Sequence, residues 1–478
     1  MNRTLLLVSA AGLLALGALF VGKPPPPAVP PPPPVTDTSH TVARPDDAPA
    51  TTVLPLVVAQ PADGAVTLSG KLSGAYVSAG PSEVFAWMEL KARPAAPGRR
   101  VPVNLALVVD RSGSMAGQKL RDARRAATEL VQRLTPEDRL ALIHYGTDVT
   151  AFPSRPVTQA VRQELLAAID AIRDDGSTNI SGGLNEAARA LRPHVNEYRV
   201  SRAILLSDGQ PTEGLVEDRD LMKLARQLRD EGITVSALGV GEDFHTTLMR
   251  GMAEQGGGFS GFIDDSAQLA EVFSRELDQA TSTVARRVEL RLDLPPEVRD
   301  AQVMGLPATR EANTVKVPLY DLAGDQSVRV VVKLTLDAQP TPAPRPLLDA
   351  HVSYTDVARD TPAQTALTLS ASVTQDTALV RANLDKDVRV HATRALGTQH
   401  MVAAAEEMKR GNRSGALTLL RNARKVFGAS SHALQGELAD LEQTEAAYGK
   451  AANDGDVARE TRKLYKKTMK NFGQNNAY

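Results

Sequence analysis

Long apolar runs alternate with amphipathic segments between residues 101 and 284. The runs are uninterrupted and rich in β-branched residues: VNLALVVD, LALIHYG, AILLSD and ITVSALGVG. Each is followed by turn residues and then by a helical period, as in GQKLRDARRAATELVQRL. Continuous apolar strands separated by helices are typical of a parallel sheet with helices on both faces. The pattern therefore predicts a doubly wound, mostly parallel α/β domain over residues 101–284.

The segments on either side of this domain follow a two-residue period. Alternation is regular in VFAWMEL at residues 84–90 and in VRVVVKL at residues 328–334. Such runs, bounded by Pro, Gly and Asp turns, predict half-buried antiparallel strands. The block at residues 53–100 is too short to form a stable sandwich alone. We therefore expect it to complete one antiparallel β-sandwich with residues 285–385, so that the α/β domain is inserted between the two halves.

Residues 386–478 return to a helical period. The stretch AAAEEMKRGNRSGALTLLRNARKVF places small residues at helix-contact spacing on both sides of a Gly-containing turn. This pattern predicts an α-helical C-terminal region built from helical hairpins.

The N-terminus carries a pattern typical of export. Residues 1–22 contain one early cation, Arg3, and then an uncharged, mostly apolar run. This pattern predicts a signal peptide. If the run stays uncut it predicts a membrane anchor, because roughly 18 apolar residues suffice to cross a bilayer. We expect the rest of the chain to lie in the periplasm, at the cell surface, or anchored to the membrane and facing outside the cytoplasm. Residues 23–52, rich in proline, predict a disordered but extended linker; a docking motif for a proline-recognising partner is the alternative.

Composition removes several classes of function. The chain has no cysteine, which excludes disulfides, thiolate zinc sites, iron–sulfur clusters and cysteine nucleophiles. The formal net charge is -1, so the chain as a whole has no electrostatic footprint for nucleic acid. No HExxH pair, phosphate-binding GxxxxGK[ST] loop or GxSxG elbow is present. We therefore do not expect an enzyme.

Polar residues cluster where the predicted parallel strands end, which is where open α/β sheets bind ligands. Asp110, Ser112 and Ser114 follow the first strand in a DxSxS arrangement. Thr178 precedes a predicted helix, and Asp208 ends another strand. Hydroxyls and carboxylates are hard oxygen ligands that suit a small cation retaining some of its waters. The five residues therefore predict a divalent metal site.

These motifs resemble those of the von Willebrand factor type A (VWA) family. The resemblance covers about 180 residues, including the strand run before DRSGSM, the GSTNISGGL segment and LLSDGQPT. The family's metal-ion-dependent adhesion site consists of DxSxS, a Thr and an Asp, and all five are present here. In bacterial members a β-sandwich commonly flanks the domain.

The resemblance implies a division of roles within the site. Ser112, Ser114 and Thr178 would contact the metal through their hydroxyls, whereas Asp110 and Asp208 would act mainly through bound waters. The ion would be Mg²⁺, with Ca²⁺ or Mn²⁺ as alternatives, and it would accept an Asp or Glu carboxylate from a partner protein. We therefore expect an exported, metal-dependent adhesion or interaction protein; its oligomeric state is not predicted.

Other interpretations stay open at this point. The DxSxS turn alone could simply cap the following helix, and the fold could exist without using a metal. The main alternative function is a structural or assembly scaffold of an envelope complex, in which the metal only stabilises the fold. A third, a chaperone-like or subunit role within a metal-inserting or channel-like complex, rests on family analogy alone.

Overall fold

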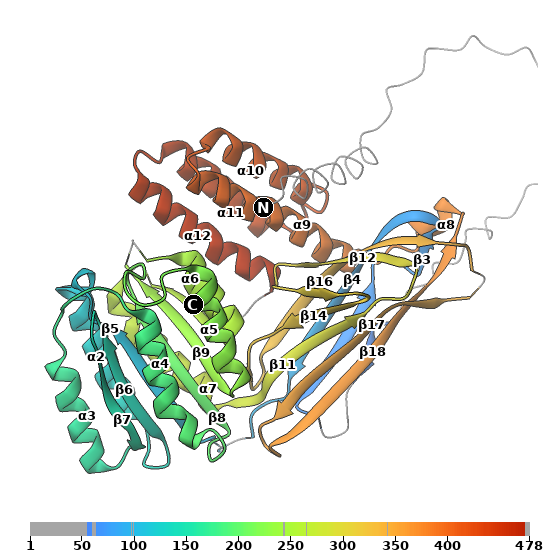
Figure 1. Ribbon diagram of the computed structural model, residues 1–478. Coiled ribbons are helices and arrows are strands. Elements are labelled where there is room, and N and C mark those ends of the chain that lie inside the picture. The colour runs from blue at the N-terminus through green and yellow to red at the C-terminus, as the bar shows by residue number, and fades with distance from the viewer. Residues whose placement is uncertain are drawn as a thin grey trace, which may run out of the picture. The chain divides into compact units, whose positions relative to one another are not determined.

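The computed structural model describes residues 55–59, 64–96, 98, 100–241, 244–263, 265–341 and 343–473 (Figure 1). The predicted signal or anchor at residues 1–22 and the proline-rich linker at residues 23–52 lie outside the described residues. Within the described part of the chain, no helix is both long and apolar enough to cross a membrane.

The α/β domain is built on a six-stranded sheet of order β10-β9-β8-β5-β6-β7. All neighbouring pairs are parallel except β6 and β7, which are antiparallel. The central strands β5, β8 and β9 are buried along their whole length, which explains their uninterrupted apolar sequences. The strands are β5 (Val103–Asp110), β6 (Arg139–Tyr145), β7 (Val149–Pro156), β8 (Val200–Ser207), β9 (Ile233–Val240) and β10 (Gly257–Ile263).

Helices cover both faces of this sheet, as a doubly wound fold requires. One apolar core contains residues of α4, α5 and α6, and a second core on the other face contains residues of α2, α3 and α7. The predicted doubly wound α/β fold is therefore confirmed. The helices are α2 (Gln118–Arg133), α3 (Gln159–Ala171), α4 (Ile180–Leu191), α5 (Asp218–Asp230), α6 (Thr246–Gly256) and α7 (Leu269–Thr281), with short 3-10 turns at Gly113–Met115, Arg192–His194 and Ser266–Gln268.

Two further sheets form the β-sandwich, and they share one apolar core. The five-stranded sheet has the order β1-β2-β4-β16-β12, and the other has the order β13-β14-β11-β17-β18-β3, with β15 paired to β11. Buried and less buried residues alternate along the strands, as the two-residue period predicted. The strands are β1 (Val57–Ala59), β2 (Val66–Leu72), β3 (Tyr76–Ser78), β4 (Gly80–Ala92), β11 (Thr283–Asp293), β12 (Val298–Met304), β13 (Thr309–Glu311), β14 (Thr314–Pro318), β15 (Leu322–Ala323), β16 (Ser327–Ala338), β17 (Arg345–Asp356) and β18 (Thr361–Thr374).

The α/β domain is inserted into this sandwich. Strand β4, which precedes the domain, pairs antiparallel with β16, which follows it, from Gly80 opposite Ala338 to Lys91 opposite Ser327. The chain enters and leaves the domain at one place, where the amide of Val101 donates to the carbonyl of Thr281 at 2.9 Å. The predicted insertion is thus confirmed, whereas the predicted domain boundaries stay predictions.

The C-terminal region is helical, as predicted, and it packs against the α/β domain (Figure 1). Residues of α9, α10, α11 and α12 share one apolar core with α4, α5 and α6. Gly397 permits close packing within the region, because a Cβ atom there would lie 2.2 Å from the ring of Phe427. The helices are α8 (Thr377–Ala382), α9 (Lys386–Lys409), α10 (Arg413–Gly428), α11 (Gln435–Lys450) and α12 (Asp454–Phe472).

Candidate functional site

The candidate site lies at the carboxyl edge of the α/β sheet, where the strand order reverses. Strand β5 has β6, the next strand in the chain, on one side and β8, which comes later, on the other. The connections from β5 and β8 therefore run to opposite faces and leave a crevice between them. Asp110 is the last residue of β5, and Ser207 is the last residue of β8.

Asp110 is fully buried, and both of its carboxylate oxygens have donors from the chain. The Ser112 amide donates to Oδ1 at 2.8 Å, and the Ser207 hydroxyl donates to Oδ2 at 2.6 Å. Burial nevertheless raises the pKa of Asp110 from 3.8 to about 6, although these hydrogen bonds act in the opposite direction. The fold therefore holds a carboxylate in place where a charge is costly.

Asp208 is equally buried and is linked to Asp110 through two serines. The Ser112 and Ser114 hydroxyls lie 3.1 Å apart, and the Ser114 hydroxyl donates to Asp208 Oδ1 at 2.7 Å. The Lys119 ammonium donates to the other oxygen, Oδ2, at 2.5 Å. Ser114 is exposed whereas Ser112 is buried, so the serine pair reaches from the interior to the surface.

Thr178 joins this cluster from the loop before α4. A Cβ atom on Gly209 would lie 3.3 Å from Thr178 Oγ1 and 3.4 Å from Ser114 Oγ, so the two hydroxyls flank the same small space. The Thr178 amide donates to Thr212 Oγ1 at 2.9 Å, which fixes the loop against the segment after Asp208. The structure thus brings all five predicted site residues together.

The donor set suits a small, hard cation. Among the described residues, no three His, Asp or Glu side chains are grouped to hold a metal, so an ion here would depend on hydroxyls. The separation of 3.1 Å between Ser112 Oγ and Ser114 Oγ is close to the spacing of neighbouring ligands, about 3 Å, on an octahedral Mg²⁺ with bonds of about 2.1 Å. A serine that donates its proton to Asp208 keeps its lone pairs for the cation. The residues therefore fit the expected ion.

Three residues that contribute to the site were not predicted from the sequence. Ser207 and Thr212 hold Asp110 and the Thr178 loop, and Lys119 neutralises Asp208. For Ser207 a signal existed, because it is a polar residue at the end of an otherwise apolar strand. Lys119 carried none, since a lysine at the start of a helix usually extends into solvent.

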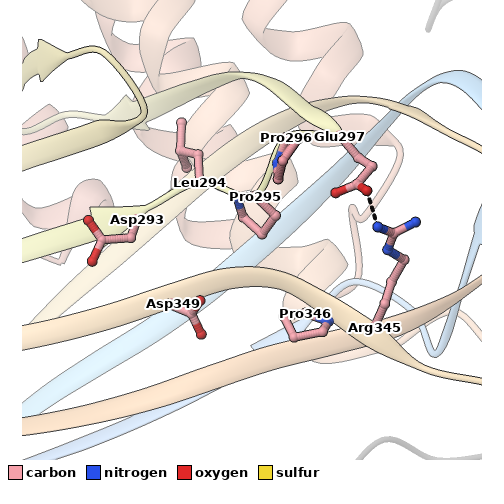
Figure 2. Close-up of a pocket in the computed structure, with 8 residues that line it drawn as sticks. All are labelled: Asp293, Leu294, Pro295, Pro296, Glu297, Arg345, Pro346 and Asp349. Carbon is pink, nitrogen blue, oxygen red and sulfur yellow. Dashed lines mark hydrogen bonds and ion pairs between the residues drawn. The ribbon is translucent and has the colours of Figure 1, made fainter.

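A different hollow, of about 530 Å³, lies on the sandwich, and Figure 2 shows the residues that line it. Asp293, Glu297 and Asp349 line it together with Arg345, which pairs with Glu297. Asp293 and Asp349 each accept a hydrogen bond from a neighbouring threonine, at 2.8 and 2.5 Å. Because its acids are engaged and its lining contains no hydroxyl side chain, this hollow lacks the donor set found at the sheet edge.

Comparison with known sequences finds a family model that matches the α/β domain. Residues 104–275 match the model of the von Willebrand factor type A domain. The chain is 28% identical over 397 residues to the uncharacterized protein sll0103 of Synechocystis sp., covering 78% of this chain and 89% of that protein. It is 30% identical over 190 residues to human inter-alpha-trypsin inhibitor heavy chain H4, covering 37% of this chain but 20% of that protein. The similarity to the heavy chain thus spans about a fifth of that protein's length.

Two solved structures share the fold over most of the chain. A von Willebrand factor type A protein from Catenulispora acidiphila superposes with a TM-score of 0.67 at 18% identity, covering 84% of this chain and 97% of that one. The ArnB paralog VWA2 from Sulfolobus acidocaldarius gives a TM-score of 0.56 at 18% identity, covering 84% and 98%. At this identity the likeness concerns the fold alone.

Proposed function

We propose that this protein, whose residues 104–275 match the von Willebrand factor type A domain, binds another protein through a metal ion held at the carboxyl edge of its α/β sheet. Ser112, Ser114 and Thr178 hold the ion through their hydroxyls, and Asp110 and Asp208 act mainly through bound waters. One observation carries this proposal: both oxygens of both carboxylates already accept hydrogen bonds from the chain. The neutral hydroxyls are therefore the oxygens available to the ion.

This arrangement favours binding over catalysis. The ion, when bound, supplies a positive charge that the neutral hydroxyls compensate only weakly. An Asp or Glu carboxylate from a partner completes the coordination, and exclusion of water from the interface strengthens that contact. Within the chain, the hydrogen bonds to Asp110 and Asp208 keep the serines in position. Mg²⁺ is the ion that we propose, with Ca²⁺ or Mn²⁺ as alternatives.

The apolar run at residues 1–22 and the proline-rich segment after it support a location outside the cytoplasm, in the periplasm or at the cell surface. There the linker would separate the folded part from a membrane.

Metal binding and partner binding are tested separately. Isothermal titration with Mg²⁺ measures the first, and capture from envelope extracts in Mg²⁺ and in EDTA, with the eluted proteins identified by mass spectrometry, measures the second. We expect Asp110→Ala to abolish both and Ser114→Ala to weaken both at least tenfold, with the fold retained by circular dichroism. Asp170→Ala removes an exposed acid on α3 and serves as the matched control.

Capture by the wild-type protein that is equal in EDTA and in Mg²⁺ would contradict the proposal. It would favour the alternative, a structural scaffold in which the metal only stabilises the fold. Deleting residues 386–478 is a poor test of that alternative, because α9 to α12 share an apolar core with α6. Point substitutions on the exposed faces of these helices test it better.

A further inference from the structure

The candidate metal site contains a cation supplied by the chain itself. Lys119 Nζ lies 2.5 Å from Asp208 Oδ2 and 3.3 Å from the carbonyl oxygen of Ser114. The Asp208 side chain is 0% exposed and that of Lys119 is 28% exposed, so this ion pair is largely withdrawn from water. Such a pair is far less screened by solvent than a pair on the surface.

The loop after β9 leaves room for the side chain of Lys119. Gly241, which follows β9 and has a φ of 85°, lies against the lysine stem. A Cβ atom at Gly241 would lie 2.8 Å from Lys119 Cε and 3.1 Å from Nζ, so a side chain there would compete with the ammonium group for this space. The glycine therefore allows the lysine to lie beside Asp208, where its two hydrogen bonds hold it.

Local helix preferences do not explain this lysine. Lys119 is the second residue of α2, and the first turn of that helix contains no acid. The amino end of a helix disfavours a cation because its free amides carry partial positive charge. A residue that opposes the local preference and is nevertheless held firmly points to a role at the site.

We propose that Lys119 is a built-in counter-cation that sets the affinity of this site for its metal ion. This inference rests on the proposed function. Of the two negative charges that Asp110 and Asp208 bring, the ammonium group cancels one. Lys119 thereby holds Asp208 in place when no ion is bound, and its repulsion weakens the binding of a divalent ion by the chain alone. A carboxylate from a partner restores the missing negative charge, so ion and partner bind cooperatively.

Substitution of Lys119 separates this role from simple packing. Lys119→Gln keeps a hydrogen-bond donor for Asp208 but removes the charge, and Lys119→Arg keeps the charge. In Mg²⁺ titrations by calorimetry we expect Lys119→Gln to bind Mg²⁺ about five- to fiftyfold more tightly than wild type, and Lys119→Arg to stay within about twofold. Lys223→Met removes a lysine from the exposed part of α5 and controls for net charge.

Two further measurements complete the test. In EDTA, the melting temperature of Lys119→Gln should fall below that of the wild type, and saturating Mg²⁺ should remove most of the difference. Sodium acetate, compared with sodium chloride at equal ionic strength, should raise the Mg²⁺ affinity of the wild type more than that of Lys119→Gln.

Mg²⁺ affinity of Lys119→Gln that is unchanged or weaker would overturn the counter-cation role, and equal effects of acetate on both proteins would overturn the cooperativity. Asp110→Ala should not bind Mg²⁺. If the wild type and Lys119→Gln also fail to bind Mg²⁺, the proposed metal function itself is contradicted.

Discussion

Burial raises the pKa of Asp110 to about 6, above its ordinary value of 3.8. Relative to the unfolded chain, the folded protein favours the protonated acid, so the contribution of Asp110 to stability falls as the pH rises from about 4 to about 6 and stays low above that range. The contribution of this residue alone should therefore make the metal-free protein less stable at pH 8 than at pH 5. A metal ion reverses the preference, because it favours the ionised form.

The substitution Asp110→Asn follows from this balance. The amide oxygen can still accept from the Ser112 amide, and the amide nitrogen can donate to the Ser207 hydroxyl, which can act as an acceptor. At pH 8 in EDTA we expect a melting temperature equal to or above that of the wild type. In 5 mM Mg²⁺ the wild type should gain stability and the variant should not. Differential scanning fluorimetry measures both, and a loss of several degrees in EDTA would contradict the argument.

Gly209 offers a second test at this scale. A methyl group at this position would lie 3.3 Å from Thr178 Oγ1 and 3.4 Å from Ser114 Oγ, within the space that both hydroxyls flank. We expect Gly209→Ala to weaken Mg²⁺ binding at least fivefold in calorimetry while the free energy of unfolding in EDTA changes by about 1 kcal/mol or less. Gly436→Ala, where a Cβ atom meets nothing within 4 Å, is the matched control.

Residues close in sequence made the site predictable in part. Asp110, Ser112 and Ser114 lie on one turn, so their proximity follows from the chain alone. Asp208 was placed beside them by the rule that parallel strands end at one edge of a sheet, and Thr178 by the resemblance to the von Willebrand factor type A family. Lys119 could not be placed, because its position depends on the packing of the β9 loop around its stem.

At the scale of single elements, the two hydrophobic periods separated the sheet of the α/β domain from the strands of the sandwich. The antiparallel edge strand β7 (Val149–Pro156) was not distinguished, because none of its residues is fully buried and it carries no continuous apolar run. Contacts between elements also lie beyond such patterns. The ring of His391 on α9 stacks on Trp87 of β4 at 5.4 Å, which joins the helical region to the sandwich.

Burial, with the nearby Arg329 and Arg394, lowers the pKa of His391 from 6.5 to about 4. The folded state thus holds a neutral imidazole, whereas the unfolded chain takes up a proton as the pH falls below about 6.5. The stability contributed by neutral His391 is complete above pH 6.5 and declines as the pH falls toward 4.

Asp110 acts in the opposite direction over this range, but it does so equally in the wild type and in a His391 variant. Between pH 7.5 and pH 5 we therefore expect the melting temperature of the wild type to decrease by about 2–4 °C relative to that of His391→Gln. His432→Gln, at an exposed position, is the control and should follow the wild type. Equal changes in melting temperature for all three proteins, measured by circular dichroism, would show that His391 does not contribute to the pH dependence of stability.

At the scale of the whole molecule, a buried ion pair joins the inserted domain to the sandwich. Arg202 on β8 lies 3.3 Å from Glu276 on α7 and 3.9 Å from Asp321, and both Arg202 and Glu276 are 0% exposed. Asp321 in turn accepts from the Arg287 amide of β11 at 3.0 Å. Replacing Glu276 takes the nearer carboxylate away from the buried Arg202 guanidinium and leaves Asp321, at 3.9 Å, to compensate the charge only in part.

Glu276→Gln should therefore cost about 3–5 kcal/mol in the free energy of unfolding. Glu271→Gln, on the exposed side of the same helix, should change it by about 0.5 kcal/mol or less. Urea titrations followed by fluorescence and by circular dichroism give both values. Similar values for the two variants would show that the buried pair contributes no more than the exposed one.

The insertion of the α/β domain was predictable because residues 53–100 are too few to form a stable sandwich alone. The packing of the C-terminal helices was not. Small residues in the stretch AAAEEMKRGNRSGALTLLRNARKVF indicated helical hairpins, but the apolar faces of α9 and α12 gave no sign that α6 would share their core. Such contacts join segments that are far apart in the sequence, and the hydrophobic period of each segment does not show which other segment it contacts.

The closeness of Val101 and Thr281 lets the α/β domain and the sandwich change independently at their junction. Because the chain leaves the sandwich and returns to it at points one hydrogen bond apart, the insertion leaves the pairing of β4 with β16 intact. Another domain with equally close termini would fit this junction, provided that it also covers the apolar faces of α9 to α12, which share a core with the present domain. Recombination at this junction during evolution would then alter what the protein binds without rebuilding the sandwich.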